Sequence, residues 1–136
     1  MQANLRATAI IKPQGLTSVA ANTTSPSVNF RVDWPITGCV LWMVGSVKGA
    51  TSNDNYVAGM SSLGVRIQVR GQTELITTGS GADYMQFSSA FPAVGFRMPI
   101  GIKVKQTEAW FVYFINVHAS LAFTPDVEFG VAEEGR

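Results

Sequence analysis

Residues 109–117 read Ala-Trp-Phe-Val-Tyr-Phe-Ile-Asn-Val, with aromatic or β-branched side chains at odd and even positions alike. Successive side chains of an extended strand point to opposite faces of a sheet. One face would therefore carry Phe111, Tyr113, Ile115 and Val117, and the other Trp110, Val112 and Phe114. Because a strand in a two-sheet protein turns only one face to the core, the second apolar face needs another layer, a loop or another protein chain as cover.

Further strand patterns lie on both sides of this stretch, separated by glycine, proline and small polar residues. Residues 38–47 form a nearly continuous apolar run, which is typical of a strand covered on both faces. The other stretches expected to be strands are 5–12, 28–32, 65–70, 74–78, 100–105 and 126–131. About eight strands predict an all-β fold, a single antiparallel β-sandwich of jelly-roll type.

Local signals refine this prediction in the middle of the chain. Gly71-Gln72 is a plausible hairpin turn, and the alternation before it places Arg66 and Arg70 on one exposed face. Residues 48–55 are rich in turn formers. Residues 83–90 have room for one or two helical turns before Phe91-Pro92. We therefore expect at most one short helix.

The length of 136 residues predicts one domain, residues 1–136, with a single core. Residues 16–27 are small and polar, which favours either an ordinary surface loop or an arm that a partner orders. Residues 133–136 read as a polar tail.

The composition excludes several classes of partner. Charged residues make up 14% of the chain, against a typical value of about 25%. The net charge is +1 and the basic residues are scattered, so nucleic acid is a poor candidate. No secretory signal pattern and no apolar run long enough to span a bilayer are present, so we expect no membrane partner and synthesis in a cytoplasm. The low charge is typical of a subunit whose surface is occupied by other subunits.

The search for chemistry yields no catalytic, metal or cofactor site. Cys39 lies in an apolar run and reads as a buried thiol, and His118 reads as a satisfied histidine at a strand end. Asn53-Asp54-Asn55 lacks the glycine and distal glutamate of a calcium loop and reads as an Asx turn. Gly79-Ser80-Gly81 lacks the lysine of a phosphate loop, and no carboxylate pair stands out by spacing. We therefore expect a protein that is not an enzyme.

The aromatic residues leave a second class open. A shallow, exposed set of aromatics could form a sugar-binding platform, since jelly rolls often host lectins, whereas core packing is the alternative for most of them. The residues concerned are Trp34, Trp42, Tyr56, Tyr84, Trp110 and Tyr113.

The expected hairpin at Gly64–Leu75, the aromatic stretch Trp110–Phe114, the low charge and the small polar loops together give the chain a resemblance to small virion proteins of tailed bacteriophages. Within that group the chain is similar in size and class to the jelly-roll capsid cement, or decoration, proteins. The resemblance covers the whole chain and implies a dimer on the outside of an icosahedral shell, where it ties neighbouring major capsid proteins together. It implies no residue-by-residue site.

On this interpretation the protein acts by adhesion, and we expect three kinds of contact. Trp110, Val112 and Phe114, or equally the opposite face of the same strand, would pair two copies. Arg66 and Arg70 would meet acidic groups of the shell. The segment 16–27, with Leu16 and Val19, and the C-terminal tail would reach neighbouring subunits. The alternatives are that both faces of the aromatic strand are covered within one subunit, that the protein is a carbohydrate-binding module, or that it is a shell- or tail-forming subunit.

Overall fold

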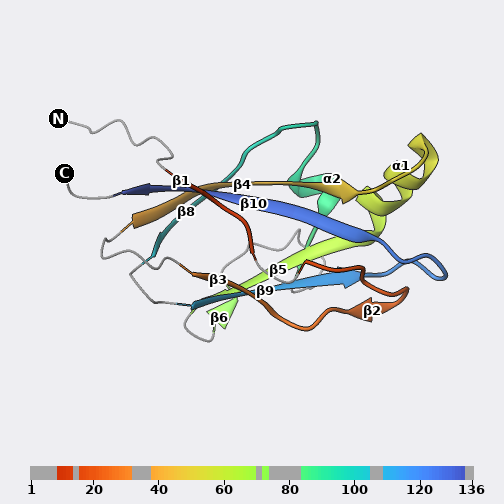
Figure 1. The fold of residues 1–136 in the computed structure, drawn as a ribbon, viewed down its shortest axis with the longest axis horizontal. Helices are drawn as coiled ribbons and strands as arrows, with labels where there is room; N and C mark the ends of the chain where they lie inside the picture. Colours follow the sequence, from red (N-terminus) through yellow and green to blue (C-terminus); the bar gives the residue numbers. More distant parts are fainter. Residues whose placement is uncertain are drawn as a thin grey trace.

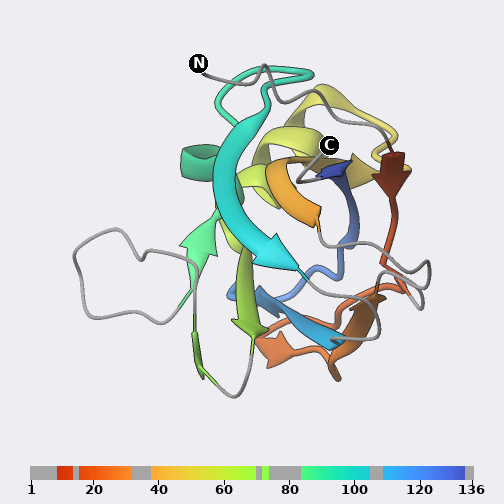
Figure 2. The same cartoon turned by 90° about the vertical axis from the view of Figure 1, so that its left-hand side faces the viewer.

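Two antiparallel sheets face each other in the computed structural model (Figure 1), which describes residues 9–13, 16–31, 38–69, 72–73, 84–104 and 109–133. The first sheet has the order β1 (Ala9–Ile11), β10 (Thr124–Glu133), β4 (Gly38–Lys48), β8 (Met98–Val104). The predicted class, an all-β antiparallel sandwich, is confirmed. Figure 2 shows the sandwich from one end, with β8, β4 and β1 in one layer and β5, β9 and β3 in the other.

The second sheet is centred on two long strands, β9 (Ala109–Asn116) and β5 (Leu63–Val69). β9 pairs with β5 along one edge and with β2 (Thr23–Thr24) and β3 (Val28–Arg31) along the other. The edge of β5 that does not pair with β9 pairs with β6 (Gln72–Thr73) and β7 (Met85–Gln86). The aromatic stretch is thus a central strand, paired on both edges over most of its length.

The core fills the space between the sheets. Trp110 of β9 meets Phe129 of β10 edge to face, with ring centroids 6.1 Å apart. Phe114 meets Phe87 in the same way at 6.2 Å. Alternate residues of β10, Val127, Phe129 and Val131, are buried, as the expected alternation predicts. The two sheets therefore share one hydrophobic core.

Two helices lie together at one end of the sandwich (Figure 1), so the expectation of at most one short helix is wrong. α2 (Phe87–Ala90) falls inside the predicted helical stretch. α1 (Asn53–Ser62) begins in the segment that was expected to be turns, and the side chain of Ser52 caps it by accepting a hydrogen bond from the Asn55 backbone N–H at 3.1 Å. Asn53-Asp54-Asn55 is consequently the first turn of a helix rather than an Asx turn.

Tertiary packing explains why the pattern of the sequence did not reveal α1. Its interior contains Gly59, an unfavourable helix residue. A side chain at Gly59 would bring a Cβ within 2.7 Å of Val47 and 3.0 Å of Phe123, so glycine lets the helix lie close against β4 and the loop before β10. Contact with the sheets, rather than intrinsic propensity, stabilises this helix.

Two smaller differences concern loops and turns. The segment 16–27, expected to be a loop, contributes β2 and an isolated bridge from Val19 to Phe123. The predicted hairpin is confirmed by the pairing of β5 with β6, but Val69 pairs with Gln72, so Gln72 belongs to the strand rather than to the turn. The strand expected at 74–78, the stretch Gly79-Ser80-Gly81 and the last three residues of the predicted tail lie outside the described residues.

Candidate interaction surface

The outer face of the second sheet carries an apolar row that no other layer of the described chain covers fully. Phe111 is 39% exposed and Val117 is 50% exposed, while Tyr113 and Ile115 between them are half-buried. We call these four residues the β9 stripe. It is the second apolar face expected from the sequence, and it remains partly open to solvent.

Residues of β5 border the β9 stripe in register. Arg66 lies opposite Tyr113, and Gln68 lies opposite Phe111. The Arg66 guanidinium stands 4.7 Å from the centre of the Tyr113 ring, a cation–π contact. A fixed positive charge is therefore attached to the apolar row.

A second aromatic side chain, that of Tyr84, lies over β5 on this outer face. Gly64 pairs with Ile115, and a Cβ at Gly64 would collide with the ring of Tyr84. The absence of a side chain at Gly64 allows the Tyr84 ring to lie directly on the sheet. The outer face thus combines apolar, aromatic and cationic groups.

The other face of β9 is inside the protein. Trp110 and Val112 are fully buried and Phe114 is 1% exposed, all in the shared core. Their assignment to a pairing surface is wrong, because the opposite sheet of the same chain already covers them. Of the two faces proposed from the sequence, only the β9 stripe is available to a partner.

The remaining predicted contact residues are distributed differently. Val19 is buried through its backbone bridge to Phe123, and Leu16 is partly buried against the core, so neither extends freely toward a neighbour. Arg66 lies on the outer face as expected. Arg70 lies outside the described residues.

The outer face of the first sheet is polar and charged by comparison. Lys12 forms an ion pair with Asp126, with 2.5 Å between Nζ and Oδ1. The hydrogen bond to Asp126 is the largest cause and raises the pKa of Lys12 above its ordinary value of 10.5; burial opposes it, and the negative charges of Asp126 and Glu128 add to the upward shift. Nearby, Arg97 lies 4.7 Å from the centre of the Trp42 ring. The indole in turn covers Gly130, where a Cβ would collide with it.

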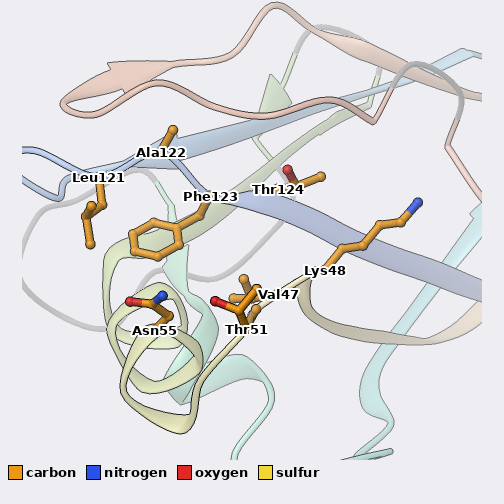
Figure 3. A pocket seen from close by; sticks show the side chains of 10 residues that line it. Val47, Lys48, Thr51, Asn55, Leu121, Ala122, Phe123 and Thr124 are labelled. Carbon is orange, nitrogen blue, oxygen red and sulfur yellow. The ribbon is translucent and has the colours of Figure 1, made fainter.

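Described residues line three pockets near the end of the sandwich that carries the helices. The pocket in Figure 3 has a volume of about 210 Å³ and is formed by the turn after β4, the start of α1 and the loop before β10. Phe123 lies at its centre, and the side chain of Lys48 extends away from that ring. The second has a volume of about 190 Å³ and includes Tyr56, Asp126 and Glu128. The third has a volume of about 280 Å³ and lies between α1 and residues 88–94.

His118 is a satisfied histidine at a strand end, as expected. Its Nδ1 accepts hydrogen bonds from the backbone N–H groups of Ser120 at 3.0 Å and Leu121 at 2.9 Å. Because both donors are backbone groups, Nδ1 must be unprotonated in this arrangement. The ring also packs edge to face on Phe123, with centroids 5.5 Å apart. His118 therefore organises the loop before β10.

Within the described ranges, no group of three or more His, Cys, Asp or Glu residues could hold a metal ion. No helix among the described residues is long and apolar enough to cross a membrane.

Comparison with known proteins adds no relative to this description. No protein-family model matches the chain, and no curated protein or solved structure matches it either. The chain is therefore characterised by its fold and its surfaces: an antiparallel β-sandwich with a cation-bordered apolar stripe on one outer sheet face and a charged surface on the other.

Proposed function

We propose that the protein is a non-enzymatic virion structural protein, a capsid cement or decoration protein that binds the outside of an icosahedral phage shell. It would stabilise the shell by bridging neighbouring major capsid proteins. The observation that carries this proposal is the β9 stripe with Arg66 stacked on it. An exposed apolar row on a rigid sheet is typical of a surface that binds another protein.

The strand order supports the jelly-roll form of the sandwich. Counting β2 with β3 and β6 with β7 as one strand each reduces the ten segments of the described ranges to eight. Early strands then pair with late ones in nested order, β1 with β10, β2/β3 with β9, β4 with β8 and β5 with β6/β7. Successive pairs alternate between the two sheets, as in a long hairpin rolled into a sandwich.

The mechanism is mass action. A protein that binds the assembled shell, but not its separated subunits, shifts the equilibrium toward assembly. Each copy adds a modest free energy, and many copies on one lattice multiply it. No chemical step is needed, and a stiff fold serves this purpose because little conformational entropy is lost on binding.

Charge would set the orientation of the protein on the shell. Arg66 is held against Tyr113, so its guanidinium group is already in place when the protein meets its partner. An acidic group of a major capsid protein beside an apolar patch would match this surface. The partner contact would then be centred on Phe111 and Tyr113.

Co-sedimentation tests this proposal. Empty shells from the phage whose genome encodes the chain are mixed with the purified protein and pelleted, and the bound copies are counted at saturation. We expect Phe111→Asp to weaken attachment by about 30-fold or more, since it places a charge in the apolar contact. Ile10→Asp is the matched control, because Ile10 is an exposed apolar strand residue that pairs with Gly130 in the first sheet.

Other results of this experiment would contradict the proposal or indicate another class of protein. A wild-type protein that does not bind the shells contradicts the cement function. Equal binding by the Phe111→Asp variant contradicts the role of the β9 stripe. Closed rings or shells formed by the pure protein would instead indicate a shell- or tail-forming subunit.

The pocket that contains Tyr56, Asp126 and Glu128 favours carbohydrate binding as a second candidate function. An aromatic side chain beside two carboxylates is a common arrangement in sugar sites. The aromatic rings of Trp42 and Tyr113 are less suitable as platforms, because Arg97 and Arg66 stack on them. Binding of the isolated protein to a glycan array, lost in Tyr56→Ala, would establish this alternative.

A further inference from the structure

The loop between β9 and β10 is built around the side chain of His118. Its ring nitrogen Nδ1 accepts the backbone N–H groups of Ser120 and Leu121, at 3.0 and 2.9 Å. The backbone N–H of His118 donates to Oδ1 of Asn116, and the ring packs edge to face on Phe123. One ring nitrogen therefore satisfies two successive backbone donors of this loop.

The two ends of the loop are fixed independently of the ring. At one end, the Val117 N–H donates at 3.0 Å to the carbonyl oxygen of Ser62, the last residue of α1. At the other end, Val19 and Phe123 exchange two backbone hydrogen bonds, at 2.8 and 3.2 Å. A change of conformation in residues 118–122 would therefore leave both ends attached to the sandwich.

The two hydrogen bonds at Nδ1 exist only while the imidazole is neutral. A neutral histidine has one ring nitrogen that carries a proton and one that accepts, whereas a protonated histidine has a donor at both nitrogens. Turning the ring over would only present the other N–H to Ser120 and Leu121. Protonation of His118 therefore removes the acceptor and directs an N–H at two backbone N–H groups.

The neighbouring segments place no carboxylate on the ring. Residues 16–24, which join the loop at Val19, contain no titratable side chain, and in residues 116–123 His118 is the one titratable side chain. The acidic residue of α1, Asp54, lies in its first turn with Tyr56, at the end opposite Ser62. A new charge on His118 is therefore not paired by these segments.

The charged residues of the adjacent strands are engaged elsewhere or lie apart from the ring. Arg66 of β5 stacks on Tyr113, and Asp126 of β10 is paired with Lys12. Lys48 lines the pocket of Figure 3 with Leu121 and Phe123, and its side chain extends away from the Phe123 ring. Within the described ranges, His118 forms no ion pair.

We infer that His118 is a pH-sensitive latch, and that protonation of its imidazole releases residues 118–122. Leu121, Ala122 and Phe123 form one wall of the pocket of about 210 Å³, so release of the loop uncovers the Phe123 ring, which is 7% exposed in the closed form. The closed form cannot bind a proton at Nδ1 without losing both hydrogen bonds, whereas the open form can. A falling pH therefore favours the open form. This inference does not depend on the proposed function.

Amide hydrogen exchange and ring nitrogen shifts, both measured by NMR on the full chain, test the latch. Between about pH 7 and about pH 5, histidine titrates while most carboxylates stay ionised. His118 is the one histidine of the chain. As its ring becomes protonated, we expect the protection factors of the Ser120 and Leu121 amides to fall by about 10-fold or more. The amides of Val19 and Phe123 are the internal control and should keep their protection.

Two variants separate the charge of the ring from a merely structural role. Asparagine offers a side-chain oxygen that accepts hydrogen bonds and does not titrate, so the loop of His118→Asn should stay closed throughout this pH range. His118→Ala lacks the acceptor at every pH, so its Ser120 and Leu121 amides should be unprotected throughout.

Three results would overturn the latch. They are a wild-type ring that stays neutral down to about pH 5, a protonated ring with Ser120 and Leu121 still protected, and a His118→Asn variant with the same pH dependence as the wild type. A loop that opens in a chain that never binds shells would contradict only the cement function. A chain that binds shells while its loop stays closed would contradict only the latch.

Discussion

At the scale of single residues, Asn116 is the buried polar group with the most structural consequence. Its Nδ2 donates to the carbonyl oxygens of Val19 at 3.0 Å and Leu121 at 2.9 Å, and its Oδ1 accepts from the His118 N–H at 2.9 Å. One side chain, 1% exposed, thereby joins the end of β9 to the segment before β2 and to the loop before β10. Neither its position in the sequence nor its type reveals this role.

We expect Asn116→Ala to lower the free energy of unfolding by about 3 kcal/mol, because three backbone groups lose their partner in or near the core. Urea denaturation monitored by tryptophan fluorescence measures the change. Asn53→Ala, at the exposed start of α1, is the matched control and should change stability by less than about 0.5 kcal/mol. Equal effects of the two substitutions would contradict the role of Asn116.

The ion pair of Lys12 with Asp126 predicts a pH dependence at the alkaline end. The pKa of Lys12 is raised in the folded protein, so its contribution is fully present below the unfolded value near 10.5 and is lost as the pH rises through the folded pKa. Because the Lys12 side chain is 46% exposed, this contribution is at most about 1 kcal/mol. Above the folded pKa the stability advantage of wild type over Lys12→Met should disappear.

An NMR titration of the Lys12 side chain checks the cause of this shift. Asp126→Asn should return the pKa of Lys12 toward 10.5, since it removes the largest contribution. Asp54→Asn, in the first turn of α1, is the control and should leave the titration of Lys12 unchanged. A Lys12 pKa that is the same in wild type and Asp126→Asn would rule out the ion pair in solution.

At the scale of secondary-structure elements, close approaches at glycine decide how the helices meet the sheets. α1 approaches β4 at Gly59, and the segment after α2 places Phe91 over Gly45 of β4. These contacts position residues 88–94 and the pocket between them and α1. The sequence contains both glycines, but only the tertiary structure identifies the side chains that lie over them.

We expect Gly45→Ala to lower the free energy of unfolding by about 1–3 kcal/mol, because the added methyl group would meet the Phe91 ring at 2.6 Å and Val127 at 3.1 Å. Ser46→Ala, at the next position of the same strand, is the control with a change of less than about 0.5 kcal/mol. Thermal or urea unfolding measures both. An equal stability of Gly45→Ala and wild type would mean that Phe91 does not pack over β4 in solution.

At the scale of the whole molecule, the described surface divides into regions of different charge. The outer face of the second sheet is apolar with a cation, the outer face of the first sheet carries the Lys12–Asp126 ion pair and Glu128, and the residues that line the pocket between α1 and residues 88–94 carry no charge. Different partners fit these regions for electrostatic reasons.

Much of the strand content could be predicted from the sequence because alternation with a period of two is a local property. The stretches around β3, β4, β8 and β10 were expected close to where they occur, and the aromatic stretch is indeed a central strand. α1 was missed because its helix depends on the packing of Gly59 and on the Ser52 cap rather than on a helical pattern.

The sequence by itself determined that β9 has two apolar faces, because successive side chains of a strand point to opposite faces of the sheet. Which face became the core was decided by the tertiary structure: Phe129 of β10 packs on Trp110, whereas on the outer face Arg66 stacks on Tyr113 and Phe111 stays 39% exposed. Burial depends on contacts between residues far apart in the chain, and no local pattern contains that information.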